Sequence, residues 1–64
     1  MKKIFLIELF ERAGWIYDSF RDDETLRFQK AVNPNDDNSE IMYIYFNKKS
    51  ANSDLYAFTD IIKE

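Results

Sequence analysis

The segment of residues 41–46 limits the possible folds of this chain most strongly, because all six side chains are apolar and most are β-branched or aromatic. Such a run predicts a central strand of a sheet. Alternation along a strand places Ile41, Tyr43 and Tyr45 on one face and the other three apolar side chains on the opposite face. A strand face that borders water normally carries polar residues, so we expect both faces to be covered.

The chain has few residues with which to cover both faces of this strand. Its 64 residues are enough for a single small domain, residues 1–64, and a small core. The absence of cysteine excludes a disulfide, so packing or association must stabilise the fold. Six Phe, four Tyr and one Trp supply large side chains for that packing. With 45% hydrophobic residues, one Gly and one Pro, the composition is that of a folded protein.

The first element is predicted as a helix over residues 3–13. Apolar residues recur there with helical spacing, at Leu6, Leu9, Phe10 and Ala13. Gly14 follows at the position where a left-handed residue often ends a helix, and Trp15 would then pack on Phe10. The alternative is a strand over residues 3–7, because four consecutive apolar residues also fit a buried strand.

Two further segments, residues 15–20 and 25–32, alternate polar and apolar side chains and are predicted to form a hairpin. Residues 33–39 are predicted as a loop. Pro34 in this loop cannot donate a hydrogen bond to a neighbouring strand, and its Asn and Asp neighbours favour turns. The central strand of residues 41–46 follows, and a second polar loop is expected over residues 47–53.

The last segment, residues 55–62, fits two structures. Its apolar residues Leu55, Phe58, Ile61 and Ile62 have helical spacing, whereas Tyr56 and Phe58 also suit a strand. We favour a fourth strand over residues 55–59, followed by a helical turn. The predicted fold is therefore α+β, with an N-terminal helix packed on a three- or four-stranded antiparallel sheet.

Catalysis is not expected from these residues. Without His and Cys, the usual nucleophile–base pairs and zinc sites are missing. The serines fall in or beside predicted turns, where hydroxyl groups bond to the local backbone. Residues 33–39 carry side-chain oxygens at alternate positions, but a calcium loop also needs a glycine and a bidentate glutamate that are absent here. We predict no enzyme activity, no cofactor and no metal.

The net charge of −3 argues against binding to nucleic acid or to an anionic membrane. Aromatic residues on a sheet can stack nucleobases, so a single-stranded nucleic-acid-binding protein is kept as the alternative, although a basic track is missing. The apolar run of residues 4–7 ends at Glu8, which is too soon for a signal peptide. We therefore expect a cytoplasmic protein of a bacterial host cell.

Protein binding remains as the predicted function, because one short helix can cover only one face of the sheet. The expected anchors are Trp15, Tyr17, Tyr43 and Tyr45, since Trp and Tyr are common interface residues. Acidic residues expected to present negative charge to a partner are Asp22, Asp23, Glu24, Asp36 and Asp37. The partner is either a second copy, in a homodimer that would be purely structural, or a different protein that this one regulates. In the remaining alternative, residues 55–62 form a helix over the open face of a monomer.

Three short segments carry a resemblance to known proteins. They are residues 14–17 (Gly-Trp-Ile-Tyr), 26–28 (Leu-Arg-Phe) and 43–46 (Tyr-Ile-Tyr-Phe). Together they resemble short proteins encoded by phages and plasmids of low-GC Gram-positive bacteria. The resemblance implies a small acidic inhibitor or regulator that binds a host enzyme or defence component, and it assigns no functional residue.

Overall fold

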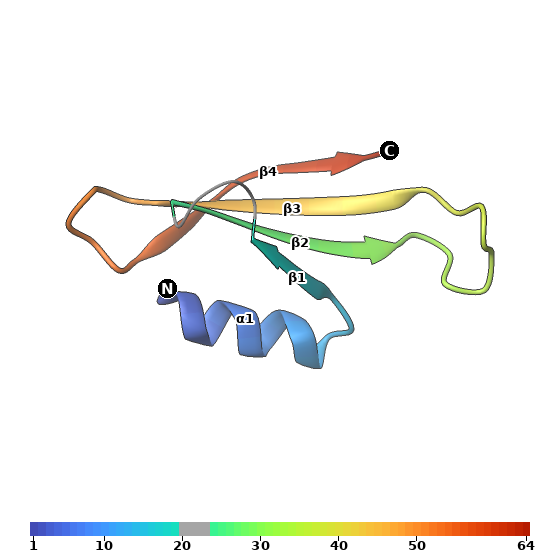
Figure 1. The fold of residues 1–64 in the computed structure, drawn as a ribbon, viewed down its shortest axis with the longest axis horizontal. Coiled ribbons are helices and arrows are strands. Elements are labelled where there is room, and N and C mark those ends of the chain that lie inside the picture. Colours follow the sequence, from blue (N-terminus) through green and yellow to red (C-terminus); the bar gives the residue numbers. More distant parts are fainter. Residues whose placement is uncertain (20–23) are drawn as a thin grey trace.

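The computed structural model describes residues 1–19 and 24–64. In these residues a helix is followed by a four-stranded antiparallel sheet (Figure 1). The elements are α1 (Lys3–Arg12), β1 (Ile16–Ser19), β2 (Thr25–Ala31), β3 (Ile41–Lys48) and β4 (Tyr56–Lys63). The predicted α+β fold is confirmed, and the alternative strand over residues 3–7 is wrong.

The end of α1 has the predicted glycine cap. Gly14 adopts a φ of 91°, in the left-handed region that glycine enters without strain. The N–H of Trp15 donates to the carbonyl of Phe10 at 2.9 Å, and the N–H of Gly14 donates to that of Glu11 at 3.1 Å. The rings of Phe10 and Trp15 also meet edge to face, with centroids 5.7 Å apart. Both hydrogen bonds and the apolar contact are those of a Schellman motif.

Each strand pairs with the next along the chain, so the sheet has the order β1-β2-β3-β4. Phe28 in β2 lies opposite Tyr17 in β1 and Ile44 in β3. These residues and Phe46 define the helix face, the side of the sheet on which α1 packs. The predicted hairpin and central strand are confirmed, but β3 extends two residues further, because Asn47 pairs with Thr25 and Ala57 instead of entering a loop.

The predicted helical turn after residue 59 is wrong, because β4 continues as a strand to Lys63. Its end is held by β3: the N–H of Glu64 donates to the carbonyl of Ile41 at 2.9 Å, and Ile41 donates back at 2.6 Å. A bulge interrupts the register, since Tyr45 pairs with Asp60 whereas Phe46 pairs with Phe58. The alternative in which residues 55–62 form a helix over the face of the sheet opposite α1 is also wrong.

The core is small and lies under α1. Among the described residues, four side chains are buried: Leu6, Leu26, Phe28 and Tyr56. Partly buried aromatic side chains of α1, β1 and β3 pack around them. Figure 1 shows α1 lying beside β1, while β4 forms the opposite edge of the sheet. The helix therefore leaves much of β3 and β4 without a covering element in the described residues.

Candidate functional site

The face of the sheet opposite α1 is here called the open face. By strand alternation and register, the side chains on it include Ile16, Asp18, Arg27, Gln29, Tyr43, Tyr45, Asp60 and Ile62. Tyr43 sits between Gln29 and Ile62 on the neighbouring strands, and Tyr45 sits between Arg27 and Asp60. α1 packs on the other face. The open face thus combines aromatic, aliphatic and charged side chains, and no other described element covers it.

An ion pair crosses the open face. The Nε of Arg27 donates to Oδ2 of Asp18 at 3.1 Å, and the Nη2 of Arg27 donates to the same oxygen. This hydrogen bonding raises the pKa of the Arg27 guanidinium above its ordinary value. The guanidinium also lies 5.0 Å from the centroid of the Tyr43 ring. Arg27 therefore holds the Tyr43 ring in place, and Asp18 balances the charge of the Arg27 guanidinium.

A shallow hollow of about 370 Å³ lies at the β4 side of the open face. Its lining comes from β2, β3 and β4: Thr25, Tyr45, Asn47, Thr59, Asp60 and Ile62. The hydroxyl of Thr59, at the bulge, donates to the carbonyl of Tyr45 at 3.2 Å. Asp60 supplies the charge in this lining. Such a hollow can accept an apolar side chain flanked by hydrogen-bonding groups.

The structure separates the four aromatic residues predicted as anchors into two pairs. Tyr43 and Tyr45 lie half-buried on the open face. Trp15 and Tyr17 instead pack against the core on the helix face. The Tyr17 ring lies 5.6 Å from that of Phe28. A single partner surface therefore cannot contact all four rings on one face.

The acidic residues predicted to present charge are also separated. Glu24 precedes β2, whereas Asp36 and Asp37 are exposed in the loop that follows it. Asp36 accepts a hydrogen bond from the N–H of Asn38 at 3.0 Å, which is a local turn contact. Asp22 and Asp23 lie outside the described residues. Glu24 and the two loop aspartates do not form one patch, because the length of β2 lies between them.

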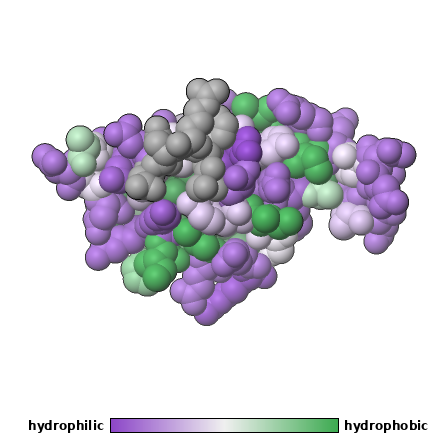
Figure 2. Space-filling view, in the orientation of Figure 1, coloured by the Kyte–Doolittle hydropathy of each residue, from purple (hydrophilic) through white to green (hydrophobic). Residues whose placement is uncertain are grey.

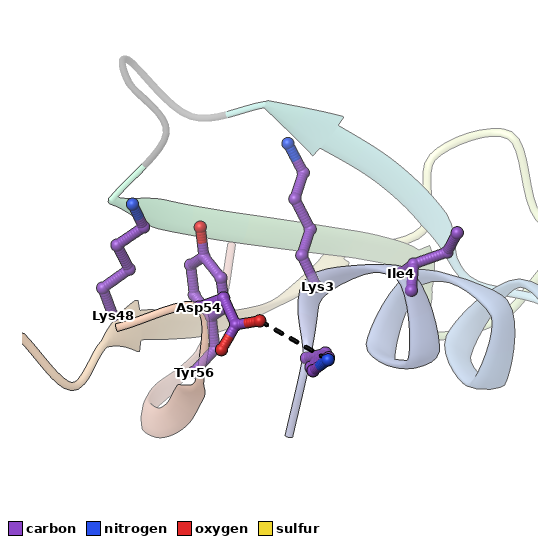
Figure 3. A pocket seen from close by; sticks show the side chains of 6 residues that line it. Lys3, Ile4, Lys48, Asp54 and Tyr56 are labelled. Carbon is purple, nitrogen blue, oxygen red and sulfur yellow. Dashed lines mark ion pairs between the residues drawn. The ribbon is translucent and has the colours of Figure 1, made fainter. Parts of the chain in front are cut away.

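A second hollow, also of about 370 Å³, lies at the start of α1 and collects positive charge (Figure 3). Its lining comprises Lys2, Lys3, Ile4, Lys48, Asp54 and Tyr56. Lys2 pairs with Asp54 at 3.6 Å. Sequence reasoning missed this cluster, because the fold brings Lys48 from β3 to the first residues of the chain.

Exposed apolar side chains form a further feature that the sequence did not predict. On α1, Ile4 is 69% exposed, Phe5 56% and Leu9 53%. On β4, Phe58 is 57% exposed and Ile61 50%. In Figure 2, green hydrophobic residues interrupt the purple surface both over α1 and over the strands. Phe58 and Ile61 belong to the helix face by register, but α1 lies too far toward β1 to cover them.

In the part of the chain that the structure describes, no helix is long and apolar enough to cross a membrane. The same residues contain no group of three or more acidic side chains placed to hold a metal ion. Comparison with known proteins gives no matching family model, no curated relative and no similar solved structure.

Proposed function

We propose that this protein is a non-enzymatic binding module that contacts another polypeptide through its open face. The observation that carries the proposal is the placement of Tyr43 and Tyr45, which lie half-buried on a sheet face that no other described element covers. Tyrosine provides a large contact area at a small cost in side-chain entropy, and it leaves a hydroxyl for hydrogen bonding. The neighbouring hollow can receive an apolar side chain from the partner.

The resemblance to proteins encoded by phages and plasmids favours a partner in the bacterial host. A small module of this kind would act as an inhibitor or regulator, by occupying a surface that the host protein needs. The cytoplasm of the host cell is the corresponding place of action.

A single-stranded nucleic acid is a poorer ligand for the open face. Bases can stack on tyrosines, but the phosphates need free cationic groups close by. Arg27 lies over the Tyr43 ring, and its charge is balanced by Asp18. Asp60, opposite Tyr45, adds a negative charge to the same face. The charge of the open face therefore favours a polypeptide over a polyanion.

The proposal is tested by capture from a lysate of a low-GC Gram-positive bacterium with three forms of the chain. They are the wild type, the double variant Tyr43→Ser with Tyr45→Ser, and the control Phe5→Ser. The control removes an aromatic ring from α1, where Phe5 is 56% exposed. We expect one stoichiometric protein to be retained by the wild type and the control but lost with the folded double variant. Equal retention by all three forms, or no retained protein, contradicts the proposal.

A further inference from the structure

The hollow at the β4 side of the open face contains a negative charge that no described cation balances. Its volume is about 370 Å³, and Asp60 is the charged residue in its lining. None of the ion pairs between described residues includes Asp60. Arg27 on the same face is paired with Asp18 of β1 instead. The Asp60 carboxylate is therefore available to a cation that another molecule brings to the hollow.

The bulge in β4 sets the position of this carboxylate. Thr59 is the extra residue of the bulge, and its hydroxyl donates to the carbonyl of Tyr45 at 3.2 Å. The N–H of Ile61 donates to Oδ1 of Asp60 at 2.8 Å. Bulges often redirect side chains beside functional sites. Here the two hydrogen bonds fix the direction of the carboxylate, and its second oxygen has no hydrogen-bond partner among the described residues.

The rest of the lining suits a long side chain with a planar cationic end. Tyr45 lies directly opposite Asp60, and Ile62 extends the hollow on one side with aliphatic surface. On the other side Asn47 and Thr25, which pair with each other, add side-chain oxygens. A guanidinium carries five N–H donors in one plane, stacks on aromatic rings and ends an aliphatic chain. The ammonium group of a lysine is a compact charge that would use fewer of these groups.

The open face already holds one arginine with the same two kinds of group. Arg27 donates two hydrogen bonds to the carboxylate of Asp18, and its guanidinium lies 5.0 Å from the centroid of the Tyr43 ring. Tyr45 and Asp60 again place a tyrosine ring and a carboxylate on neighbouring strands. This second pair differs because Asp60 forms no ion pair with a described cation.

We propose that the hollow binds an arginine side chain of the partner polypeptide, with the guanidinium against Asp60 and Tyr45 and the aliphatic carbons against Ile62. This inference rests on the proposed function, because it names the side chain with which a partner docks on the open face. The net charge of −3 favours the approach of a basic partner surface. An acidic side chain at the same place would be repelled by Asp60, so the contact also contributes specificity.

The hollow is tested by titration of the isotope-labelled chain with three acetylated and amidated tripeptides, Ala-Arg-Ala, Ala-citrulline-Ala and Ala-Lys-Ala. Citrulline has the shape of arginine without its charge. We expect Ala-Arg-Ala to bind with a dissociation constant in roughly the millimolar range and to shift the amides of Asn47, Thr59 and Asp60 most. The citrulline peptide should bind about fivefold more weakly, because it loses the charged contact, and the lysine peptide should also bind more weakly than Ala-Arg-Ala.

Two matched variants assign this difference to one carboxylate. Asp60→Asn keeps an oxygen that can accept from the N–H of Ile61, but it removes the charge. The arginine and citrulline peptides should then bind equally, since the charge by which they differ has lost its partner. The control Asp37→Asn removes the same charge from the exposed loop after β2 and should leave the fivefold difference unchanged.

The inference is overturned if Ala-Arg-Ala does not bind, if either other peptide binds the wild type equally well, or if the shifts lie outside the hollow. A fivefold difference that persists in Asp60→Asn overturns it as well. The titration needs no captured partner, so its failure is distinct from a failure of the proposed function. Conversely, a partner that the wild type and Asp60→Asn capture equally would contradict the arginine contact and leave the proposed function in place.

Discussion

Phe10 of α1 stacks on Phe28 of β2, with ring centroids 4.5 Å apart and an angle of 19° between the ring planes. Phe28 is fully buried, and the Phe46 ring meets it edge to face at 6.0 Å. The stack joins the helix to the sheet at the centre of the core, in which the described residues supply few other buried side chains. The stability of the molecule therefore depends strongly on this contact.

Replacement of Phe28 by alanine should lower the free energy of unfolding by about 3–5 kcal/mol, because it removes a buried ring and leaves a cavity. A loss of that size exceeds the total free energy of unfolding of many small domains. Phe28→Leu therefore provides a milder second variant. Phe58→Ala is the matched control: this ring is 57% exposed, and its loss should cost less than about 1 kcal/mol. Urea unfolding followed by Trp15 fluorescence measures all three, and similar losses at the two positions would contradict the prediction.

Gly14→Ala should destabilise the fold by about 1–2 kcal/mol, because an alanine at a φ of 91° is strained. The added methyl group itself fits, since the nearest side-chain atoms, those of Lys30, lie at 3.6 and 3.7 Å. The cost is therefore conformational. Gly14→Asn should cost less than Gly14→Ala in thermal unfolding, because asparagine tolerates the left-handed region better. The reverse order would show that the cap is not the source of the effect.

Lys2→Ser should stabilise α1 by about 0.5–1 kcal/mol. Lys2 occupies the N-cap position with extended backbone angles, but its side chain makes no capping hydrogen bond. A serine hydroxyl can accept one from the first turn. The substitution also removes the exposed ion pair with Asp54, so Asp54→Asn serves as the control and should change stability by less than about 0.5 kcal/mol. If chemical denaturation shows no gain in the free energy of unfolding for Lys2→Ser, the capping argument is wrong.

Asp18→Asn should lower the free energy of unfolding by about 1 kcal/mol, since Arg27 loses its charged partner. The pKa of Arg27 is raised in the folded state. The contribution of the ion pair to the free energy of unfolding is therefore fully present below the unfolded-state pKa, and it is lost only as the pH rises through the folded-state pKa. Both pKa values lie far above neutral pH. The difference between Asp18→Asn and wild type should therefore stay constant from pH 6 to pH 10. A difference that fades across this range would assign the effect to another group.

The sequence predicts α1 and its cap well because their signals are local. The helical spacing of Leu6 and Phe10 and the glycine at residue 14 concern neighbours within one or two turns. The course of β4 was not predictable in the same way. The bulge between Asp60 and Phe58 places Phe58 and Ile61 on one face although they are three residues apart. That spacing is also helical, so pairing with β3, rather than local sequence, decides the structure.

The candidate site depends on register to an even greater extent. Alternation alone places Tyr43 and Tyr45 on one face of a strand, and likewise Trp15 and Tyr17. Whether the two pairs share a face follows from the alignment of β1, β2 and β3, which the hairpin loops set. The lysine cluster around Lys48 likewise arises only when distant segments meet.

The open face is tested most directly by the amide chemical shifts of the labelled chain as the captured partner is added. We predict that the largest changes occur at Gln29, Tyr43, Tyr45 and Ile62, on three adjacent strands of that face. Changes confined to α1 and its exposed residues Ile4 and Phe5 would contradict the account.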